Sequence, residues 1–219
     1  MHVTIKNLLN IKSKVKQKVK DKNLDQIPQI IAVSKTFKLN HINPLIEYGH
    51  IHFGENKVQE AMDKWFEIKK QNQKIKLHLV GKLQTNKVKF ALEIFDYIHS
   101  LDNEKLAKKI SSLQVEKNKN LKLFIQVNIG NEEQKSGISE RSILDFYNYC
   151  NDLKLNVVGL MCIPPINQDV RFYFEKMKNL KRKFNMKDLS MGMSSDYLEA
   201  IENNATFIRI GSSIFGQRS

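Results

Sequence analysis

The stretch QIIAVSK, residues 29–35, is a short apolar run that ends in a serine and a lysine. A run this short and rich in β-branched residues is typical of a buried strand. Lys35, at the carboxyl end of that strand, is expected to project above the sheet. Such a lysine is either a solvated strand end or a desolvated amine that can form a Schiff base with an aldehyde. The rest of the sequence is needed to decide between the two.

Short apolar runs like this one recur along the chain and alternate with longer amphipathic stretches. The runs lie at residues 29–34, 51–53, 76–80, 95–99, 121–128, 156–161, 188–191 and 206–210. Strand–helix alternation predicts a parallel sheet with helices outside it. Eight such units predict a single (β/α)8 TIM barrel that spans residues 1–219 as one domain. A doubly wound open sheet is the competing fold, but the sequence lacks the GxGxxG or GxxxxGK[ST] turn that usually marks a nucleotide site there.

The first 22 residues carry seven lysines and one acidic residue. Their apolar side chains recur at helical spacing, at Ile5, Leu8, Ile11, Val15 and Val19. This pattern predicts an extra N-terminal amphipathic helix with a lysine-rich solvent face. A membrane-surface or transit role is the alternative for such a helix.

The composition favours a cytoplasmic protein. The chain is 41% hydrophobic, but its apolar runs are far shorter than the ~20 residues of a membrane span. Cys150 and Cys162 form no CxxC pair, which fits a reducing compartment. The net charge of +13 permits polyanion binding. Because the lysines are spread along the whole chain, we expect neither a specific nucleic-acid partner nor a membrane partner.

Chemistry in such a barrel is expected at the carboxyl ends of the strands. There, MGMSSD (residues 191–196) follows the seventh run and IGSS (residues 210–213) follows the eighth. Hydroxyls and free amides at helix starts bind anions, and the ends of strands seven and eight are the usual phosphate seat of a barrel. The alternative is that Ser194 and Ser195 only cap a helix.

Arg209 lies between two isoleucines of the last apolar run. A buried arginine is costly without a partner, so Arg209 either pairs with an acid such as Glu55 or faces the barrel mouth and holds a ligand atom. His50 and His52 form an HxH pair that can begin a metal site, although no histidine follows His99 to complete it.

Two further side chains have simpler expected roles. His78 is expected to be a hydrogen-bonded residue of the barrel. Cys162 has no histidine near it in the sequence and is expected to be a buried thiol.

A strand-end lysine, a phosphate seat and a buried arginine together suggest pyridoxal 5′-phosphate. The motifs resemble those of the YggS/PROSC family of pyridoxal phosphate-binding proteins, single-domain barrels related to the amino-terminal domain of alanine racemases. The resemblance covers nearly the whole chain in the right order. It rests on AVSKT (32–36), FGEN (53–56), GKLQTNK (81–87), QVN (126–128), SG (136–137), GLM (159–161), LSMGMS (189–194), RIGS (209–212) and IFG (214–216).

The resemblance implies a set of cofactor-binding residues, with no catalytic residue and no metal ligand. These are Lys35, Asn56, Ser194, Arg209, Gly211 and Ser212. It implies that Lys35 forms the internal aldimine, that the two serines and the glycine hold the phosphate, and that Arg209 faces the pyridine nitrogen with Asn56 near the ring. Lys82 and Thr85 depart from the histidine and serine expected in the family.

The function implied by the resemblance is pyridoxal phosphate homeostasis, as a cytoplasmic buffer or carrier whose partners are apo-enzymes. We expect a monomer that is not an enzyme. The alternative is a pyridoxal phosphate-dependent amino-acid racemase or a related enzyme. In the related racemases a tyrosine from an additional β-domain supplies the second acid/base, and this chain ends at Ser219, directly after the barrel. A polyanion-binding protein is the third hypothesis.

Overall fold

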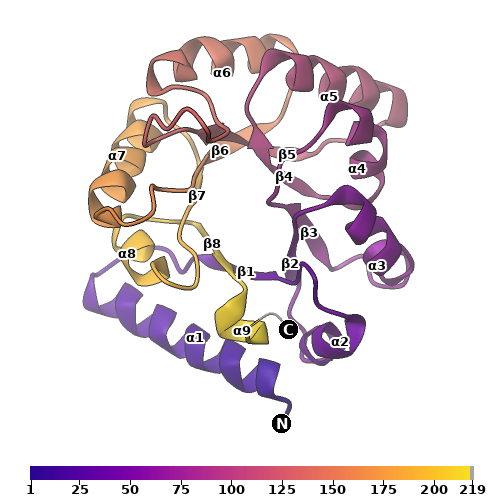
Figure 1. Ribbon diagram of the computed structural model, residues 1–219, viewed down its shortest axis with the longest axis vertical. Coiled ribbons are helices and arrows are strands. Elements are labelled where there is room, and N and C mark those ends of the chain that lie inside the picture. The colour runs from indigo at the N-terminus through magenta and orange to yellow at the C-terminus, as the bar shows by residue number, and fades with distance from the viewer. Residues whose placement is uncertain (218–219) are drawn as a thin grey trace.

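The computed structural model of the protein describes residues 1–217, in which eight parallel strands form a closed barrel (Figure 1). The strands are β1 (Gln29–Val33), β2 (His52–Glu55), β3 (Lys76–Leu79), β4 (Tyr97–Leu101), β5 (Lys122–Val127), β6 (Val157–Cys162), β7 (Asp188–Ser190) and β8 (Phe207–Ile210). Each predicted apolar run forms a strand whose ends lie within about two residues of those expected. The predicted (β/α)8 barrel is therefore confirmed.

One helix precedes β1 and another follows each strand, and the helices lie outside the barrel (Figure 1). They are α1 (Val3–Asp21), α2 (Leu39–Glu47), α3 (Val58–Gln71), α4 (Val88–Ile94), α5 (Glu104–Lys117), α6 (Ile143–Asp152), α7 (Val170–Lys183), α8 (Tyr197–Glu202) and α9 (Ser212–Phe215), with 3-10 turns η1 (Thr85–Lys87) and η2 (Glu140–Ser142). These helices bury apolar side chains in the core, as expected for helices that cover a parallel sheet.

The barrel closes where β1 pairs with β8. Ile31 lies beside Arg209 and Ala32 lies beside Ile210 in this parallel ladder. The first and last strands of the chain therefore share one rim, with no open sheet edge between them.

The predicted N-terminal helix is confirmed as α1, which packs along α2, α8 and α9 (Figure 1). Its expected apolar face is buried except at Ile5, which is half-buried. Lys18 pairs with Glu202 of α8 at 2.7 Å, and Asn7 donates to the carbonyl of Ile214 at 2.9 Å. These contacts fix α1 against α8 and α9, the helices on either side of β8 in the sequence.

The inside of the barrel holds aromatic rings and histidines. His78 stacks on Tyr97, with ring centroids 4.2 Å apart, and His99 stacks on Phe124 at 4.3 Å. His78 is fully buried and hydrogen-bonded, as predicted. Because β4 ends at Leu101, two residues later than the sequence suggests, His99 lies within the barrel and not at its rim.

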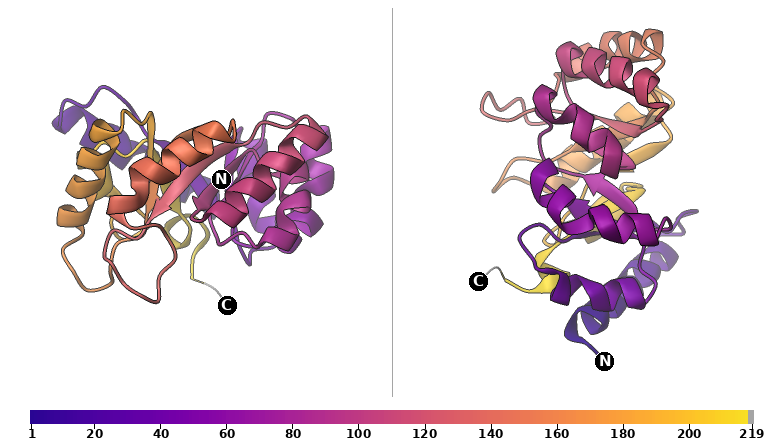
Figure 2. Two further views of the ribbon diagram at one scale, coloured as in Figure 1. Left: turned by 90° about the horizontal axis from the view of Figure 1, so that it is seen from above. Right: turned by 90° about the vertical axis from the view of Figure 1, so that its right-hand side faces the viewer.

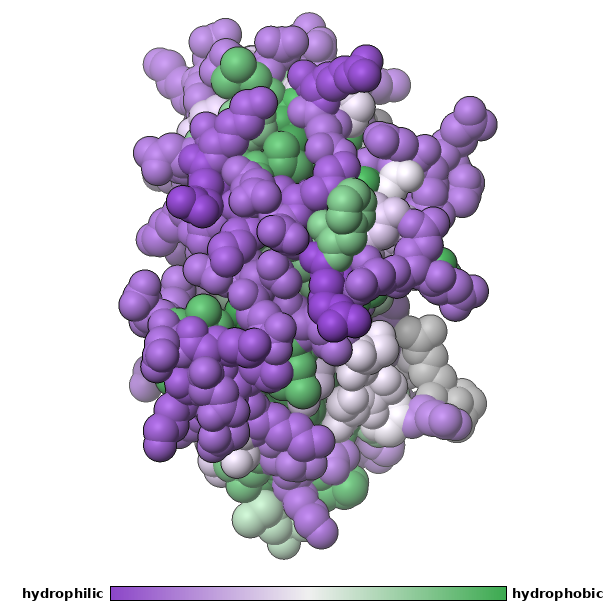
Figure 3. Space-filling view, turned by 90° about the vertical axis from the view of Figure 1, so that its left-hand side faces the viewer, coloured by the Kyte–Doolittle hydropathy of each residue, from purple (hydrophilic) through white to green (hydrophobic). Residues whose placement is uncertain are grey.

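The loops after β5 and β6 project from the end of the barrel that carries α9, as both views of Figure 2 show. This end is the rim formed by the carboxyl ends of the strands. On the face drawn in Figure 3, hydrophilic side chains predominate and apolar ones form small separate groups. Among residues 1–217, no helix has the length and apolar character needed to cross a bilayer.

We predict that the protein loses stability as the pH falls from about 6.5 toward 4. Burial lowers the pKa of His50 and of His52 to about 4, and lowers the pKa of His78 and of His99 well below 6.5. Their imidazoles stay neutral in the folded state while those of the unfolded chain take up protons. Each histidine whose pKa is lower in the folded state than in the unfolded state reduces the free energy of unfolding by up to ~1.4 kcal/mol per pH unit in this range.

Burial also raises the pKa of Glu55, which opposes this trend in part because the folded protein then binds a proton more readily. Urea unfolding followed by circular dichroism at pH 7.5, 6.5, 5.5 and 4.5 measures the net effect. The midpoint is expected to fall steadily below pH 6.5. A midpoint that stays constant across this range would contradict the prediction.

Candidate functional site

A cavity of about 550 Å³ opens at the carboxyl rim of the barrel. All six residues expected to bind a ligand line it, together with an apolar wall. The lining is Val33, Lys35, Phe37, Asn56, Val80, Ile163, Met193, Ser194, Ser195, Arg209, Gly211, Ser212, Gly216 and Gln217. Positions from the first quarter of the chain and from its last quarter are thus brought into one site.

The strands explain why these residues meet. Lys35 lies two residues after β1, and Asn56 directly follows β2. Arg209 belongs to β8, while Gly211 and Ser212 directly follow that strand. Because the strands are parallel and closed into a ring, their carboxyl ends share one rim.

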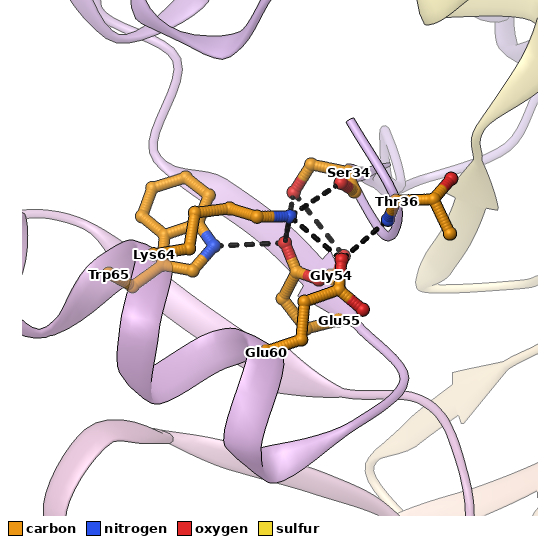
Figure 4. A network of polar contacts seen from close by, with 7 residues as sticks. All are labelled: Ser34, Thr36, Gly54, Glu55, Glu60, Lys64 and Trp65. Atoms are coloured by element: carbon orange, nitrogen blue, oxygen red, sulfur yellow. Dashed lines mark hydrogen bonds and ion pairs between the residues drawn. The ribbon is translucent and has the colours of Figure 1, made fainter. Parts of the chain in front are cut away.

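The backbone on both sides of Lys35 is held by side chains from β2 and α3 (Figure 4). The Ser34 hydroxyl donates to Glu55 Oε1 at 2.7 Å, and the Thr36 amide donates to Glu60 Oε1 at 2.5 Å. Lys64 Nζ donates to both carboxylates at 3.0 Å and to the Ser34 carbonyl at 2.9 Å. We call these five residues the β1–α3 clamp.

The clamp supports a strained backbone. Thr36 has φ +68°, in the left-handed region that a β-branched residue adopts at a cost. The hydrogen bond that its backbone amide donates to Glu60 fixes this conformation one residue after Lys35. The lysine is therefore carried by a turn whose direction is set by α3.

Glu55 is fully buried, and its cation partner is Lys64, not Arg209. The suggested Arg209–Glu55 ion pair is wrong because Lys64, projecting from α3, reaches the carboxylate from outside the strands. Trp65 Nε1 also donates to Glu55 Oε1, at 2.9 Å. Burial raises the pKa of Glu55, while the Lys64 ammonium and the hydrogen bonds from Trp65 and Ser34 oppose that rise.

Arg209 lines the cavity, in agreement with the other prediction, that it faces the barrel mouth. Its Nη1 donates to Ser190 Oγ at 2.7 Å, and its Nη2 donates to the carbonyl of Cys162 at 2.9 Å. Both acceptors are neutral. Burial lowers the pKa of Arg209, which nonetheless stays protonated near neutral pH because a free guanidinium titrates so high. The site therefore has a fixed cation at its inner wall.

Ser194 links the loops that follow β7 and β8. Its Oγ accepts the backbone amides of Gly211 and Ser213, each at 3.3 Å. The helix after β7 begins only at Tyr197, with Asp196 as its N-cap residue, so Ser194 does not cap it. Both contacts use oxygen lone pairs, which leaves the hydroxyl proton to donate to a ligand.

Two close approaches shape the rim. A Cβ atom on Gly81 would lie 2.3 Å from the carbonyl oxygen of Asn56, so only glycine lets the loop after β3 pass beside Asn56. Gly192 has φ +87°, and a Cβ there would lie 2.5 Å from Ala200 Cβ. The Met193 amide donates to Asp196 Oδ1 at 2.6 Å, which completes the turn that presents Ser194.

The remaining candidates do not form a metal site or a reactive thiol. His52 hydrogen-bonds His78, and His50 Nε2 bonds the His52 carbonyl. Within residues 1–217 no group of three or more histidine, cysteine or acidic side chains could hold a metal ion. Burial raises the pKa of Cys162 to about 12, in keeping with the predicted buried thiol.

Sequence reasoning missed the Glu60 and Lys64 contacts and the role of Ser190. Glu60 and Lys64 are four residues apart on α3, the spacing at which helical side chains pair, so a signal was present. That spacing does not reveal contact with the turn around Lys35, which depends on where α3 packs. Ser190 offered no signal beyond its place within a recognised motif.

We predict that Lys64→Met destabilises the protein by about 3 kcal/mol, because it leaves the buried Glu55 carboxylate without its cation. Urea unfolding at pH 7 measures the change. Lys70→Met is the matched control on the same helix, since Lys70 pairs with Glu67 at the exposed surface. The control is expected to change stability by less than about 0.5 kcal/mol. An equal loss of unfolding free energy in the two variants would show that Lys64 in the clamp does not stabilise the protein more than a surface lysine does.

Comparison with known proteins places this chain in a family. The family model of the alanine racemase N-terminal domain matches residues 7–219. The pyridoxal phosphate homeostasis protein of Aquifex aeolicus is 38% identical over 200 residues, which cover 87% of each chain. The protein of the same name from Pasteurella multocida is 34% identical over 224 residues, covering 97% of this chain and 96% of its own.

Solved structures agree with these relatives. PipY of Synechococcus elongatus without PLP is 31% identical, with a TM-score of 0.86 over 98% of this chain and all of its own. PipY with PLP bound has a TM-score of 0.79 over 92% of this chain.

An alanine racemase of Clostridium difficile, 11% identical, shares the fold, with a TM-score of 0.67, and this chain covers 57% of it. The resemblance drawn from the motifs is therefore confirmed. The chain belongs to the alanine racemase N-terminal domain family and, within it, to the pyridoxal phosphate homeostasis proteins.

Proposed function

We propose that this protein binds pyridoxal 5′-phosphate in the rim cavity and serves in its homeostasis. The observation that carries the proposal is that all six expected binding residues line one cavity. The expected cofactor agrees with the names of the relatives and with the PipY structure that has PLP bound.

The chemistry of the cavity supports this ligand. Pyridoxal phosphate has an aldehyde, an aromatic ring with a nitrogen, and a phosphate. The cavity offers an amine at Lys35, a cation at Arg209, and hydroxyls and amides at the loops after β7 and β8. Val33, Val80 and Met193 supply apolar surface for a ring. Each part of the ligand thus has a chemically suitable group among the lining residues.

Lys35 is proposed to bond the cofactor covalently. Its amine adds to the aldehyde carbon and one water leaves, so that a Schiff base joins lysine and cofactor. The β1–α3 clamp holds the backbone on both sides of Lys35 and so limits the positions the amine can take. Ser194, Gly211 and Ser212 are proposed to bind the phosphate through hydroxyl and amide donors, and Asn56 to lie near the ring.

Arg209 is proposed to face the ring nitrogen. An arginine donates hydrogen bonds and does not readily give up its proton, so the nitrogen accepts a hydrogen bond and stays unprotonated. When bound, pyridoxal phosphate serves as an electron sink, and an unprotonated nitrogen makes that sink weaker. This arrangement supports retention of the cofactor over amino-acid turnover.

We further propose that the protein is a monomeric, single-domain buffer or carrier without enzymatic activity that supplies apo-enzymes. The relatives are named for homeostasis, which supports this role. The competing function is that of a racemase, because alanine racemases share the fold. Incubation of the loaded protein with L-alanine, followed by chiral chromatography, distinguishes the two: formation of D-alanine would favour the racemase.

We predict that borohydride reduction of the loaded protein attaches a pyridoxyl group to Lys35. Mass spectrometry of peptides locates the adduct, and visible absorbance before and after reduction follows its formation. Lys35→Ala is expected to lose both signals and keep its circular dichroism spectrum, because only one side chain at the rim is removed. Lys38→Ala, which alters an exposed lysine nearby, is the control. An unchanged cofactor spectrum in Lys35→Ala would refute the assignment.

We predict that the double variant Ser194→Ala/Ser212→Ala binds pyridoxal phosphate roughly a hundredfold more weakly, since hydrogen bonds to a charged group are each worth about tenfold in affinity. At saturation the adduct on Lys35 is still expected. Titration followed by visible absorbance measures the affinity. Ser213→Ala is the control because Ser213 contacts Ser194 through its backbone amide. Equal affinity in the double variant and the wild type would refute the proposed phosphate-binding role of Ser194 and Ser212.

A further inference from the structure

A line of hydrogen-bonded side chains runs through the barrel from the cavity toward the opposite end. We call it the histidine chain, and it consists, in order, of Arg209, Ser190, His99, His78 and His52. Its links measure 2.7 Å, 2.8 Å, 3.0 Å and 2.9 Å in that order. Every member is buried, so the polar atoms of these side chains are hydrogen-bonded to one another in place of water.

The direction in which hydrogen bonds are donated along the histidine chain follows from its first member. Arg209 can only donate, so Ser190 Oγ accepts from it. Within the described part of the protein, the other contact of Ser190 Oγ is with His99 Nδ1. Donation from Ser190 to His99 uses the serine proton, whereas the opposite direction would leave that proton buried without an acceptor. The satisfied arrangement therefore has His99 Nδ1 unprotonated.

The same reasoning passes from ring to ring. A neutral imidazole has one N–H, so His99 carries it on Nε2 and donates to His78 Nδ1. His78 then carries its proton on Nε2 and donates to His52 Nδ1. Burial keeps both inner rings neutral by lowering the pKa of each.

The far end of the histidine chain reaches a second opening. His52, whose Nε2 carries the last N–H in this arrangement, helps to line a cavity of about 370 Å³ at the amino end of the barrel. Water there can accept this hydrogen bond, so each donor along the chain has an acceptor. Stacking of His78 on Tyr97 and of His99 on Phe124 holds the rings in the required planes.

We propose that the histidine chain holds the Arg209 guanidinium in place at the cavity, with Ser190 and His99 acting as positioning residues. The guanidinium has two neutral acceptors, and only the Ser190 hydroxyl can rotate; the Cys162 carbonyl belongs to the backbone of β6. His99 fixes that rotation by accepting the serine proton. Loss of this acceptor frees the hydroxyl and loosens Arg209. The effect on cofactor binding rests on the proposed function.

The direction of hydrogen-bond donation along the histidine chain can be measured without any cofactor. Two-dimensional ¹⁵N–¹H spectra of the histidine ring nitrogens in the apo protein distinguish the two tautomers. We expect His52, His78 and His99 all to carry the proton on Nε2. A proton on Nδ1 of His99 would overturn the inference, whatever the protein binds.

The positioning role is tested by titrating pyridoxal phosphate into variants at one site. His99→Phe keeps a ring against Phe124 but cannot accept from Ser190, and we expect about tenfold weaker binding with a shifted absorption maximum, as for the loss of one hydrogen bond to a charged network. In His99→Asn the Oδ1 atom replaces Nδ1 as an acceptor, and affinity and spectrum are expected to stay close to those of the wild type.

Two further variants complete the test. Ser190→Ala is expected to match His99→Phe, and it decides the question if His99→Phe fails to fold. His50→Phe, which removes a buried histidine outside the chain, is expected to bind like the wild type. Wild-type affinity and spectrum in both His99→Phe and Ser190→Ala would overturn the positioning role, whereas failure of the wild type to bind would overturn the proposed function and leave the tautomer measurement standing.

Discussion

The pairing of β1 with β8 is the constraint on which the candidate site depends. It sets Ile31 beside Arg209, and it brings the turn after β1 next to the amides after β8. Lys35 and Ser212 come from opposite ends of the chain and meet only because the ladder closes. A closed parallel barrel also directs the carboxyl ends of the strands to one rim. The fold therefore supplies the site as a consequence of its closure.

Two polar networks, one partly buried and one buried, support this rim from different sides. The β1–α3 clamp, built around Glu55 and Lys64, fixes the turn that carries Lys35. The histidine chain fixes Arg209 from within the barrel. Buried polar groups are costly unless they are satisfied, and satisfied networks restrict a core to one arrangement. Here both restrict the two side chains proposed to bind covalently and to face the ring nitrogen.

The family relationship and the geometry address different questions. Relatives at 34–38% identity over most of the chain establish the family. The structure adds a buried guanidinium, that of Arg209, in the cavity wall. Placed at the ring nitrogen, as we propose, it would weaken the electron sink and so favour retention of the cofactor over turnover. The racemases share the same barrel at low identity, so the fold alone does not separate carrier from enzyme.

The sequence by itself determined the barrel and the N-terminal helix, because periodicity is a local property of the chain. Its ordered motifs resemble those of a known family, and that resemblance implied the six lining residues. The sequence left two possible roles for Arg209 and ended the fourth strand at residue 99, two residues before its end in the structure. Only the tertiary structure assigned Lys64 to Glu55 and placed Ser190 and His99 behind Arg209. Such contacts join residues far apart in the chain, and they depend on strand register and helix packing, which no local pattern encodes.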